Sequence, residues 1–199
     1  GKKFVDAMTT RAGHGALASF DFTKAKKEIF GGLKQSEKDL LNEIISARRI
    51  VSINENRIQK QQRAQELSDE YGKTLKPDAF EKALQGEKDL KFYYQFNENT
   101  GLFEIGKFNE YKQIQNGKTV GLLESQEMLN GQQKTNPNTF TKLSDRATKL
   151  FEVYTEQLRL LYESGRIGQD EYLYFRDIEY APIKVLNKLI SDNASLYPD

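Results

Sequence analysis

Residues 140–164 read FTKLSDRATKLFEVYTEQLRLLYES and carry the clearest structural pattern in the chain. Apolar side chains recur there at intervals of three and four residues, which places them on one face of an α-helix. They are Phe140, Leu143, Ala147, Leu150, Phe151, Tyr154, Leu158, Leu161 and Tyr162. Gly165 follows and suits the left-handed position that ends many helices. The pattern predicts a long amphipathic helix over Phe140–Ser164 that organises the core.

A second long helix is predicted over Ser36–Tyr71. Ser36 with Asp39 three residues later is close to a capping box, and Gly72 suits the position after a helix end. Apolar residues recur through the first half, at Leu40, Leu41, Ile44, Ile45, Ala47, Val51 and Ile58. The stretch Gln59–Gln65 that follows has Ala64 as its single apolar residue. We therefore expect the second half of this helix to project into water or to contact another chain.

The chain is expected to comprise four regions. They are an N-terminal arm at 1–35, the first long helix with a short helix at 36–86, an irregular or β-hairpin insertion at 87–139, and a C-terminal helical subdomain at 140–199. The predicted fold class is therefore mainly α: an elongated helical bundle with two long amphipathic helices and a small irregular or β-hairpin insertion.

Turn signals organise the insertion. Asn97–Gly101 separates the aromatic run at 92–96 from Leu102–Ile105, and Asn116–Gly117 is a second turn. Such turns between apolar or β-branched segments are typical of β-hairpins. Gln132–Thr139, which contains Pro137, is interpreted as a polar linker to the second long helix.

Shorter helices are expected near both ends. One is predicted from about Thr23 to Phe30, one is expected to begin at Pro77 and stop at Gly86, and one is predicted over Gln169–Glu179. A last helix is expected to begin at Pro182.

Composition and charge restrict the function. The 199 residues include 30 basic and 29 acidic side chains, so the chain lacks the basic excess of a typical nucleic-acid binder. Charged residues reach 30% and apolar residues 37%, which indicates a thin core, an elongated shape or a surface completed by a partner. The absence of cysteine excludes disulfides, thiol catalysis and cysteine-bound metal. No apolar run approaches the roughly 18 residues of a membrane span.

No catalytic, cofactor-binding or metal-ligating residue is predicted. The single histidine, His14, lies between two glycines in the arm and is interpreted as a loop residue. No phosphate loop, dinucleotide fingerprint, nucleophile elbow or calcium loop occurs. Asp170 and Glu171 are interpreted as acids that stabilise a helix N-terminus. The chain is expected not to be an enzyme, and a carboxylate site within 87–135 is the alternative.

Seven residues are candidates for a partner interface: Ile58, Leu67, Tyr71, Phe92, Tyr93, Tyr94 and Phe96. The first three lie in the second half of the first long helix, and the others form an aromatic run. Such a run can stack on bases or sugars, but few basic residues are interleaved with it. The expected partners are other protein chains, either virion proteins or a second copy. No small-molecule substrate, cofactor, membrane segment or nucleic acid is expected.

Several short motifs resemble one family of proteins. The C-terminal region reads Leu161-Tyr162-Glu163-Ser164-Gly165-Arg166-Ile167-Gly168, then Asp170-Glu171-Tyr172, then Tyr180-Ala181-Pro182-Ile183. Upstream are Leu41-Asn42-Glu43-Ile44 and Arg48-Arg49-Ile50. Together these segments resemble helical regions of large phage-encoded polypeptides, including polyvalent proteins and virion-packaged proteins of crAss-like phages.

This resemblance implies a virion-associated or injected protein without catalytic residues, cut from or part of a larger polypeptide. The start at Gly1 rather than Met agrees with that expectation. The alternative is a cellular adaptor or assembly module, in the cytoplasm, whose long helices form an antiparallel coiled-coil platform.

Overall fold

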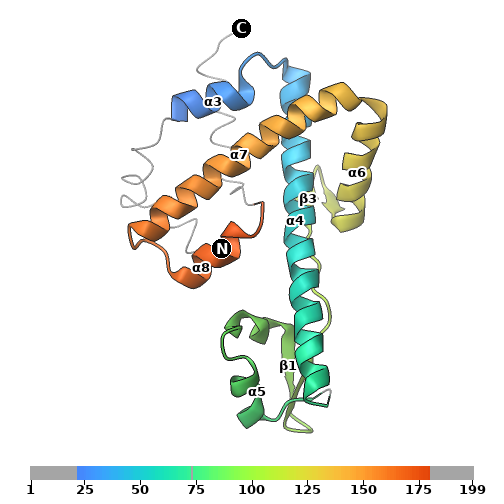
Figure 1. The fold of residues 1–199 in the computed structure, drawn as a ribbon. Coiled ribbons are helices and arrows are strands. Elements are labelled where there is room, and N and C mark those ends of the chain that lie inside the picture. Colours follow the sequence, from blue (N-terminus) through green and yellow to red (C-terminus); the bar gives the residue numbers. More distant parts are fainter. Residues whose placement is uncertain (1–21, 73, 180–199) are drawn as a thin grey trace. The chain divides into compact units, whose positions relative to one another are not determined.

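The computed structural model describes residues 22–72 and 74–179 (Figure 1). His14 and the helix expected after Pro182 lie outside the described residues. The described part is mainly helical with two small antiparallel hairpins, which confirms the coarse fold class. The chain divides into two compact units: unit 1 comprises Gly1–Ser52 and Leu122–Asp199, and unit 2 comprises Ile53–Gly121. This division differs from the four regions expected above, because its first boundary falls inside a helix.

That helix is α4, which spans Gln35–Glu70. Its start differs from the predicted capping box: the backbone N–H of Lys34 donates to the Glu37 carboxylate at 3.1 Å, and Ser36 already lies inside the helix. Glu37 thus provides the carboxylate half of a capping box two residues earlier than predicted. Lys142 also donates to it, and this bond and that of Lys34 hold the pKa of Glu37 below its usual range. Gly72 has φ of +80°, which confirms the predicted end.

Unit 1 is assembled around helix α7, Pro137–Glu163, which lies against α3 (Phe22–Phe30), α6 (Leu122–Thr135) and α8 (Gln169–Arg176). Helix α6 was not predicted. The linker expected at Gln132–Thr139 is wrong, because α6 extends to Thr135 and α7 begins at Pro137. A proline fits there, since the first helical N–H has no partner within the helix.

The apolar face of α7 is buried as predicted. Its buried residues are Leu143, Ala147, Leu150, Phe151, Tyr154, Gln157, Leu158 and Leu161. Burying each leucine contributes about 2 kcal/mol by transfer arguments. The helix ends as expected at Gly165, whose φ is +73°. The N–H groups of Gly165 and Arg166 donate to the carbonyls of Tyr162 and Leu161, which is the Schellman arrangement.

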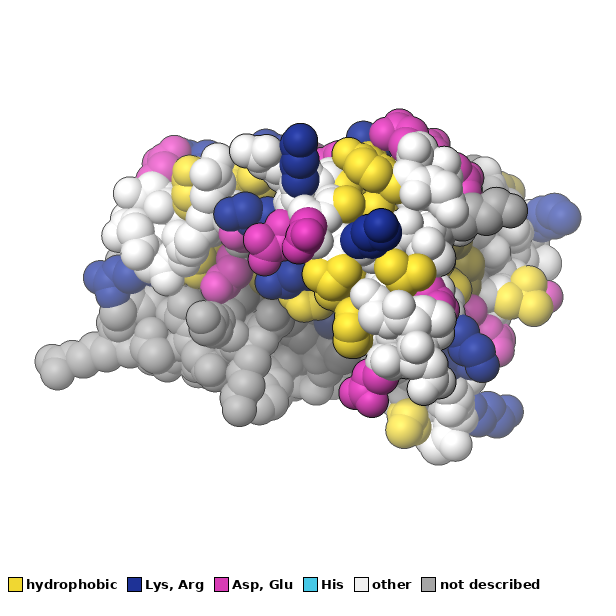
Figure 2. Space-filling view, turned by 90° about the horizontal axis from the view of Figure 1, so that it is seen from below, with side chains coloured by type: hydrophobic (Ala, Val, Ile, Leu, Met, Phe, Trp, Pro, Cys, Tyr) yellow, Lys and Arg dark blue, Asp and Glu magenta, His cyan; other side chains and the backbone are white. Residues whose placement is uncertain are grey.

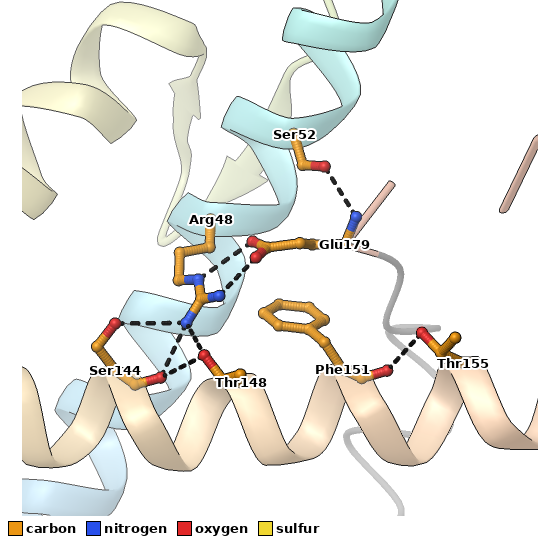
Figure 3. A network of polar contacts seen from close by, with 7 residues as sticks. All are labelled: Arg48, Ser52, Ser144, Thr148, Phe151, Thr155 and Glu179. Atoms are coloured by element: carbon orange, nitrogen blue, oxygen red, sulfur yellow. Dashed lines mark hydrogen bonds and ion pairs between the residues drawn. The ribbon is translucent and has the colours of Figure 1, made fainter. Parts of the chain in front are cut away.

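Helix α7 crosses the first half of α4 where Arg48 contacts it (Figure 3). The Arg48 guanidinium donates to Ser144 O at 2.8 Å and to Thr148 Oγ1 at 2.9 Å on α7. It also forms a two-pronged ion pair with Glu179, beyond α8. The Arg48 side chain is 17% exposed, and it lies 5.2 Å from the centre of the Phe151 ring. One arginine therefore fastens three segments of unit 1 together.

The backbone of Glu179 is also hydrogen-bonded to α4. The N–H of Glu179 donates to Ser52 Oγ at 2.8 Å, one helical turn further along α4 than Arg48. The polar groups in Figure 3 thus bond mainly to one another. Their arrangement is that of a structural clamp.

Unit 2 joins the second half of α4 to two hairpins and two short helices. After α4 come α5 (Pro77–Ala83) and the 3-10 helix η1 (Lys88–Tyr93). The first hairpin pairs β1 (Tyr94–Asn97) with β2 (Leu102–Ile105), and the second pairs β3 (Gln113–Gln115) with β4 (Lys118–Val120). Both predicted turns are therefore confirmed. Asn116 and Gly117 both have positive φ, as the tight two-residue turn requires.

The core of unit 2 is small. It consists of Ala64, Leu67, Leu75, Leu84, Leu90 and Tyr94. The ring of Phe80 on α5 stacks on Phe103 of β2, with centroids 3.8 Å apart, and meets Tyr94 edge-on. Leu75 pairs with Phe103 through two backbone hydrogen bonds, which adds a third segment beside β2.

The expectation for Gln59–Gln65 is wrong in part. Ala64 is fully buried in the unit's own core, and Gln61 bonds to the unit's own backbone. Gln59, Gln62 and Gln65 are exposed to solvent as expected. This half of α4 is therefore the base on which the chain builds unit 2.

Replacing Arg48 with lysine is expected to lower the free energy of unfolding by about 2 kcal/mol, because a charged fork with several hydrogen bonds is lost. Arg159→Lys is the matched control, since Arg159 pairs with Glu156 and Glu163 on the exposed side of α7. That change is expected to cost about 0.5 kcal/mol or less. Urea unfolding midpoints followed by circular dichroism would compare the two, and equal shifts would contradict the clamp.

Candidate protein-interaction surface

Polar side chains of α4 hold an extended segment of unit 2. Asn54, Arg57 and Gln61 are spaced three and four residues apart, so they share one face of the helix. The Asn54 amide donates to Tyr111 O at 2.9 Å and accepts from Tyr111 N at 2.7 Å. Arg57 donates to Asn109 O at 2.8 Å, and Gln61 donates to Gly106 O at 3.0 Å. We call these three side chains the polar clasp, because they bind the 106–111 segment by its backbone.

Two ion pairs fasten the region around η1 to the same helix. Arg63 donates to both carboxylate oxygens of Glu87, and Lys60 lies 2.7 Å from Asp89. The hydrogen bonds that Arg63 donates to Glu87, and then the one that it donates to Glu66, raise the pKa of Arg63 above its usual value. Within Gln59–Gln65, which was expected to face water or a partner, Lys60, Gln61 and Arg63 thus bond within unit 2.

Large apolar side chains remain exposed on unit 2. Of the seven such residues in the described part of the chain, five belong to this unit: Tyr71, Phe92, Phe96, Phe108 and Ile114. Phe92 and Ile114 are 78% and 79% exposed. We call these five residues the apolar set. On the face in Figure 2, hydrophobic side chains lie in small groups between basic and acidic ones.

The structure separates the predicted interface residues into three groups. Tyr71, Phe92 and Phe96 are exposed, and Ile58 and Tyr93 are partly buried. Leu67 and Tyr94 are 5% and 9% exposed and belong to the core of unit 2. The interface prediction is therefore wrong for Leu67 and Tyr94, because their side chains are buried inside unit 2.

Two exposed residues were not predicted. Phe108 lies in the segment that the polar clasp holds, and Ile114 lies in β3 opposite Thr119. Ile114 is flanked by two glutamines in a three-residue strand, so strict alternation places it alone on its face. That alternation is the signal that sequence reasoning could have used.

Tyr94 fixes the first hairpin to α4. Its hydroxyl donates to the Ala64 carbonyl oxygen at 2.7 Å. Burial raises the pKa of the Tyr94 phenol above its usual value, because the charged phenolate would lose its hydration. The residue therefore acts as a buried anchor between helix and hairpin.

The carboxylates in the described region 87–135 offer little to an acid–base site. Glu87, Asp89 and Glu110 each pair with a lysine or arginine, and Glu104 accepts from Asn97. Among residues 22–72 and 74–179, no cluster of three or more potential ligands could hold a metal ion. None of the described helices is both long and apolar enough to cross a membrane.

Comparison with known proteins leaves this surface as the main guide to function. No protein family matches the chain, and neither a curated protein nor a solved structure matches it.

Replacing Asn54 with alanine is expected to expose the Tyr111 amide to exchange with solvent. Asn54 is fully buried, and its loss removes both hydrogen bonds to Tyr111, at a cost of about 1–3 kcal/mol. Hydrogen exchange at Tyr111 should then accelerate on the order of tenfold or more. Glu55→Ala, at the exposed neighbouring position, is the control, and an unchanged rate in Asn54→Ala would contradict the clasp.

Replacing Tyr94 with phenylalanine is expected to lower the free energy of unfolding by about 1 kcal/mol, since one hydrogen bond is lost. The raised pKa also makes the contribution of Tyr94 to the free energy of unfolding depend on pH. Neutral Tyr94 contributes its full stability below pH about 10, and this contribution disappears as pH rises through the higher folded pKa.

The pH dependence provides a check on that interpretation. Urea midpoints measured from pH 8 to 11 should converge for wild type and Tyr94→Phe at the alkaline end. Tyr71→Phe, which alters an exposed phenol, should follow the wild type throughout. A constant gap between wild type and Tyr94→Phe would show that the phenol does not titrate as stated.

Proposed function

We propose that the chain is a non-enzymatic structural or cargo component of a bacteriophage-type virion, as part of a larger or processed polypeptide. It acts by packing against other proteins, and the apolar set of unit 2 provides the contact. The observation that carries this proposal is the exposure of Phe92 and Ile114, at 78% and 79%, in a unit whose own core is small.

The physical argument starts from the cost of exposed aromatic residues. Isolated apolar residues on a surface are ordinary, but five in a unit with a core of six residues are a large share of its apolar content. Tyrosine and phenylalanine are also the residues that protein interfaces favour at their centres. A partner that covers them would complete the burial that the small core leaves unfinished.

The assignment to a virion depends on the sequence resemblance. Its motifs coincide with functional parts of the fold: Gly165 and Ile167 belong to the end of α7, and Arg48 is the centre of the clamp. In this proposal, unit 1 is the scaffold of an elongated bundle and unit 2 presents the contact surface. The alternative adaptor would need α4 and α7 side by side as a platform, whereas α7 crosses α4 at Arg48 (Figure 1).

The proposal is tested in purified particles. Mass spectrometry of particles from the phage that carries the gene should detect peptides of this chain in stoichiometric amounts. Phe92→Ser and Ile114→Ser, combined, should lower incorporation about tenfold or more, because each removes an exposed apolar contact of hot-spot type.

The control for this experiment is Leu123→Ser, which removes a side chain 64% exposed on unit 1 and leaves the apolar set intact. It should incorporate as the wild type does. Absence of the protein from particles would refute the virion assignment. Normal incorporation of the double variant would refute the role of the apolar set.

A further inference from the structure

The outer edge of strand β1 has hydrogen-bonding groups without a partner. Phe103 of β2 exchanges two backbone hydrogen bonds with Leu75, at 3.0 and 2.8 Å. Its N–H and C=O therefore point away from β1. In an antiparallel ladder these directions alternate, so Phe96, directly opposite Phe103, directs its own N–H and C=O away from β2. Within the described residues, no hydrogen bond reaches either group of Phe96.

Neighbouring positions on β1 do not offer the same pair of groups. The N–H of Tyr94, which also points outward, donates to the Lys91 carbonyl. Gln95 and Asn97 direct their backbone groups inward to β2. Phe96 is therefore the residue of β1 at which a donor and an acceptor are both available.

This edge lacks the side chains that usually discourage pairing with another strand, and its short length is the protection that remains. Exposed edge strands of monomeric proteins commonly carry lysine, proline or a bulge that discourages an incoming strand. Strand β1 reads Tyr-Gln-Phe-Asn and has none of these residues. The Phe96 ring is 49% exposed beside Phe103, with centroids 5.1 Å apart.

We propose that β1 pairs with the β1 strand of a second copy of this chain, antiparallel and with a two-fold axis at Phe96. In this register the Phe96 N–H of each copy donates to the Phe96 C=O of the other. The two Phe96 rings then lie side by side on the same face and cover each other. The pairing deepens the proposed function, on which it rests, by naming one protein partner.

A second copy fits this edge because the outward N–H and C=O of one Phe96 complement those of another, and charge does not oppose the pairing. Residues 53–121 contain equal numbers of basic and acidic side chains, so two such units do not repel each other through net charge. The strand itself is uncharged, so no like charges oppose each other across the pair. A short strand buries little area, so the association is weak and suits detection by trapping.

The cysteine-free chain allows a direct test by disulfide trapping. Residues directly opposite in a hydrogen-bonded antiparallel pair have Cα atoms about 5.5 Å apart, within the range that a disulfide bridges. Phe96→Cys in the full chain should form a covalent dimer under mild oxidation, seen on a non-reducing gel. Gln95→Cys is the matched control at an equally exposed neighbour. Its two copies lie about 8 Å apart in this register, too far for a disulfide.

A second trapping experiment uses a pair of cysteine variants that both keep the Phe96 ring. Position 95 of one copy lies opposite position 97 of the other, so a mixture of Gln95→Cys and Asn97→Cys chains should give the mixed dimer. Phe96→Cys dimer in at least tenfold excess over Gln95→Cys dimer, together with the mixed dimer, is the expected result. No excess at position 96, or self-dimers of Gln95→Cys instead, overturns the pairing.

The disulfide-trapping experiment and the particle experiment can fail independently of each other. A chain found in particles but never trapped at position 96 refutes self-pairing alone. A chain trapped at position 96 but absent from particles refutes the virion assignment and leaves the pairing intact.

Discussion

Unit 2 depends on the hydrogen bonds that Asn54, Arg57 and Gln61 of α4 make to the backbone of the 106–111 segment. A helix normally holds its neighbours by burying an apolar stripe. The second half of α4 has few apolar residues, and only Ala64 and Leu67 reach the core of the unit. Amide and guanidinium groups on the same helix supply the remaining attachment. Because they bond to carbonyl and N–H groups, these hydrogen bonds do not depend on which side chains the bound segment carries.

The small core of unit 2 also leaves parts of its hairpins uncovered. Two hairpins of two strands each cannot cover both of their faces, and isolated two-stranded hairpins are marginal in water. The first hairpin is supported by Tyr94, Phe80 and the pairing of Leu75 with β2. The second is attached through the clasp and leaves Ile114 in solvent. Unit 1 differs because α7 buries a mainly apolar face along its length, and the polar cluster around Arg48 lies at the helix crossing.

The difference between the two units explains which features could be predicted from the sequence. The regular spacing of Leu143, Leu150 and Leu161 fixes the buried face of α7, and the turns at Asn97–Gly101 and Asn116–Gly117 fix both hairpins. The leucine spacing and the turn motifs each lie within a short stretch of chain, so they can be recognised in a single sequence.

Long-range partners leave no such signal. The bond between Asn54 and Tyr111 joins residues 57 positions apart, and neither residue type indicates it. Helix α6 was missed because its apolar residues are few and stop at Leu129, so its contact with α7 supports it more than its own pattern does. In the aromatic run, strand alternation begins only at Tyr94, which turns inward while Phe92 stays outside on η1. The composition of such a run indicates a tendency to make apolar contacts. It does not indicate which rings point into the core and which point to solvent.

The clasp gives the apolar set its significance. If Phe108 and Ile114 were needed to hold unit 2 together, their exposure would be a defect of packing. The attachment instead uses backbone atoms, so the clasp does not depend on these two side chains. A polar residue at either position would fit the same backbone and improve solubility, because exposed apolar groups favour association. In the proposed function these exposed side chains contact a partner, and the clasp explains how unit 2 holds the 106–111 segment without burying them.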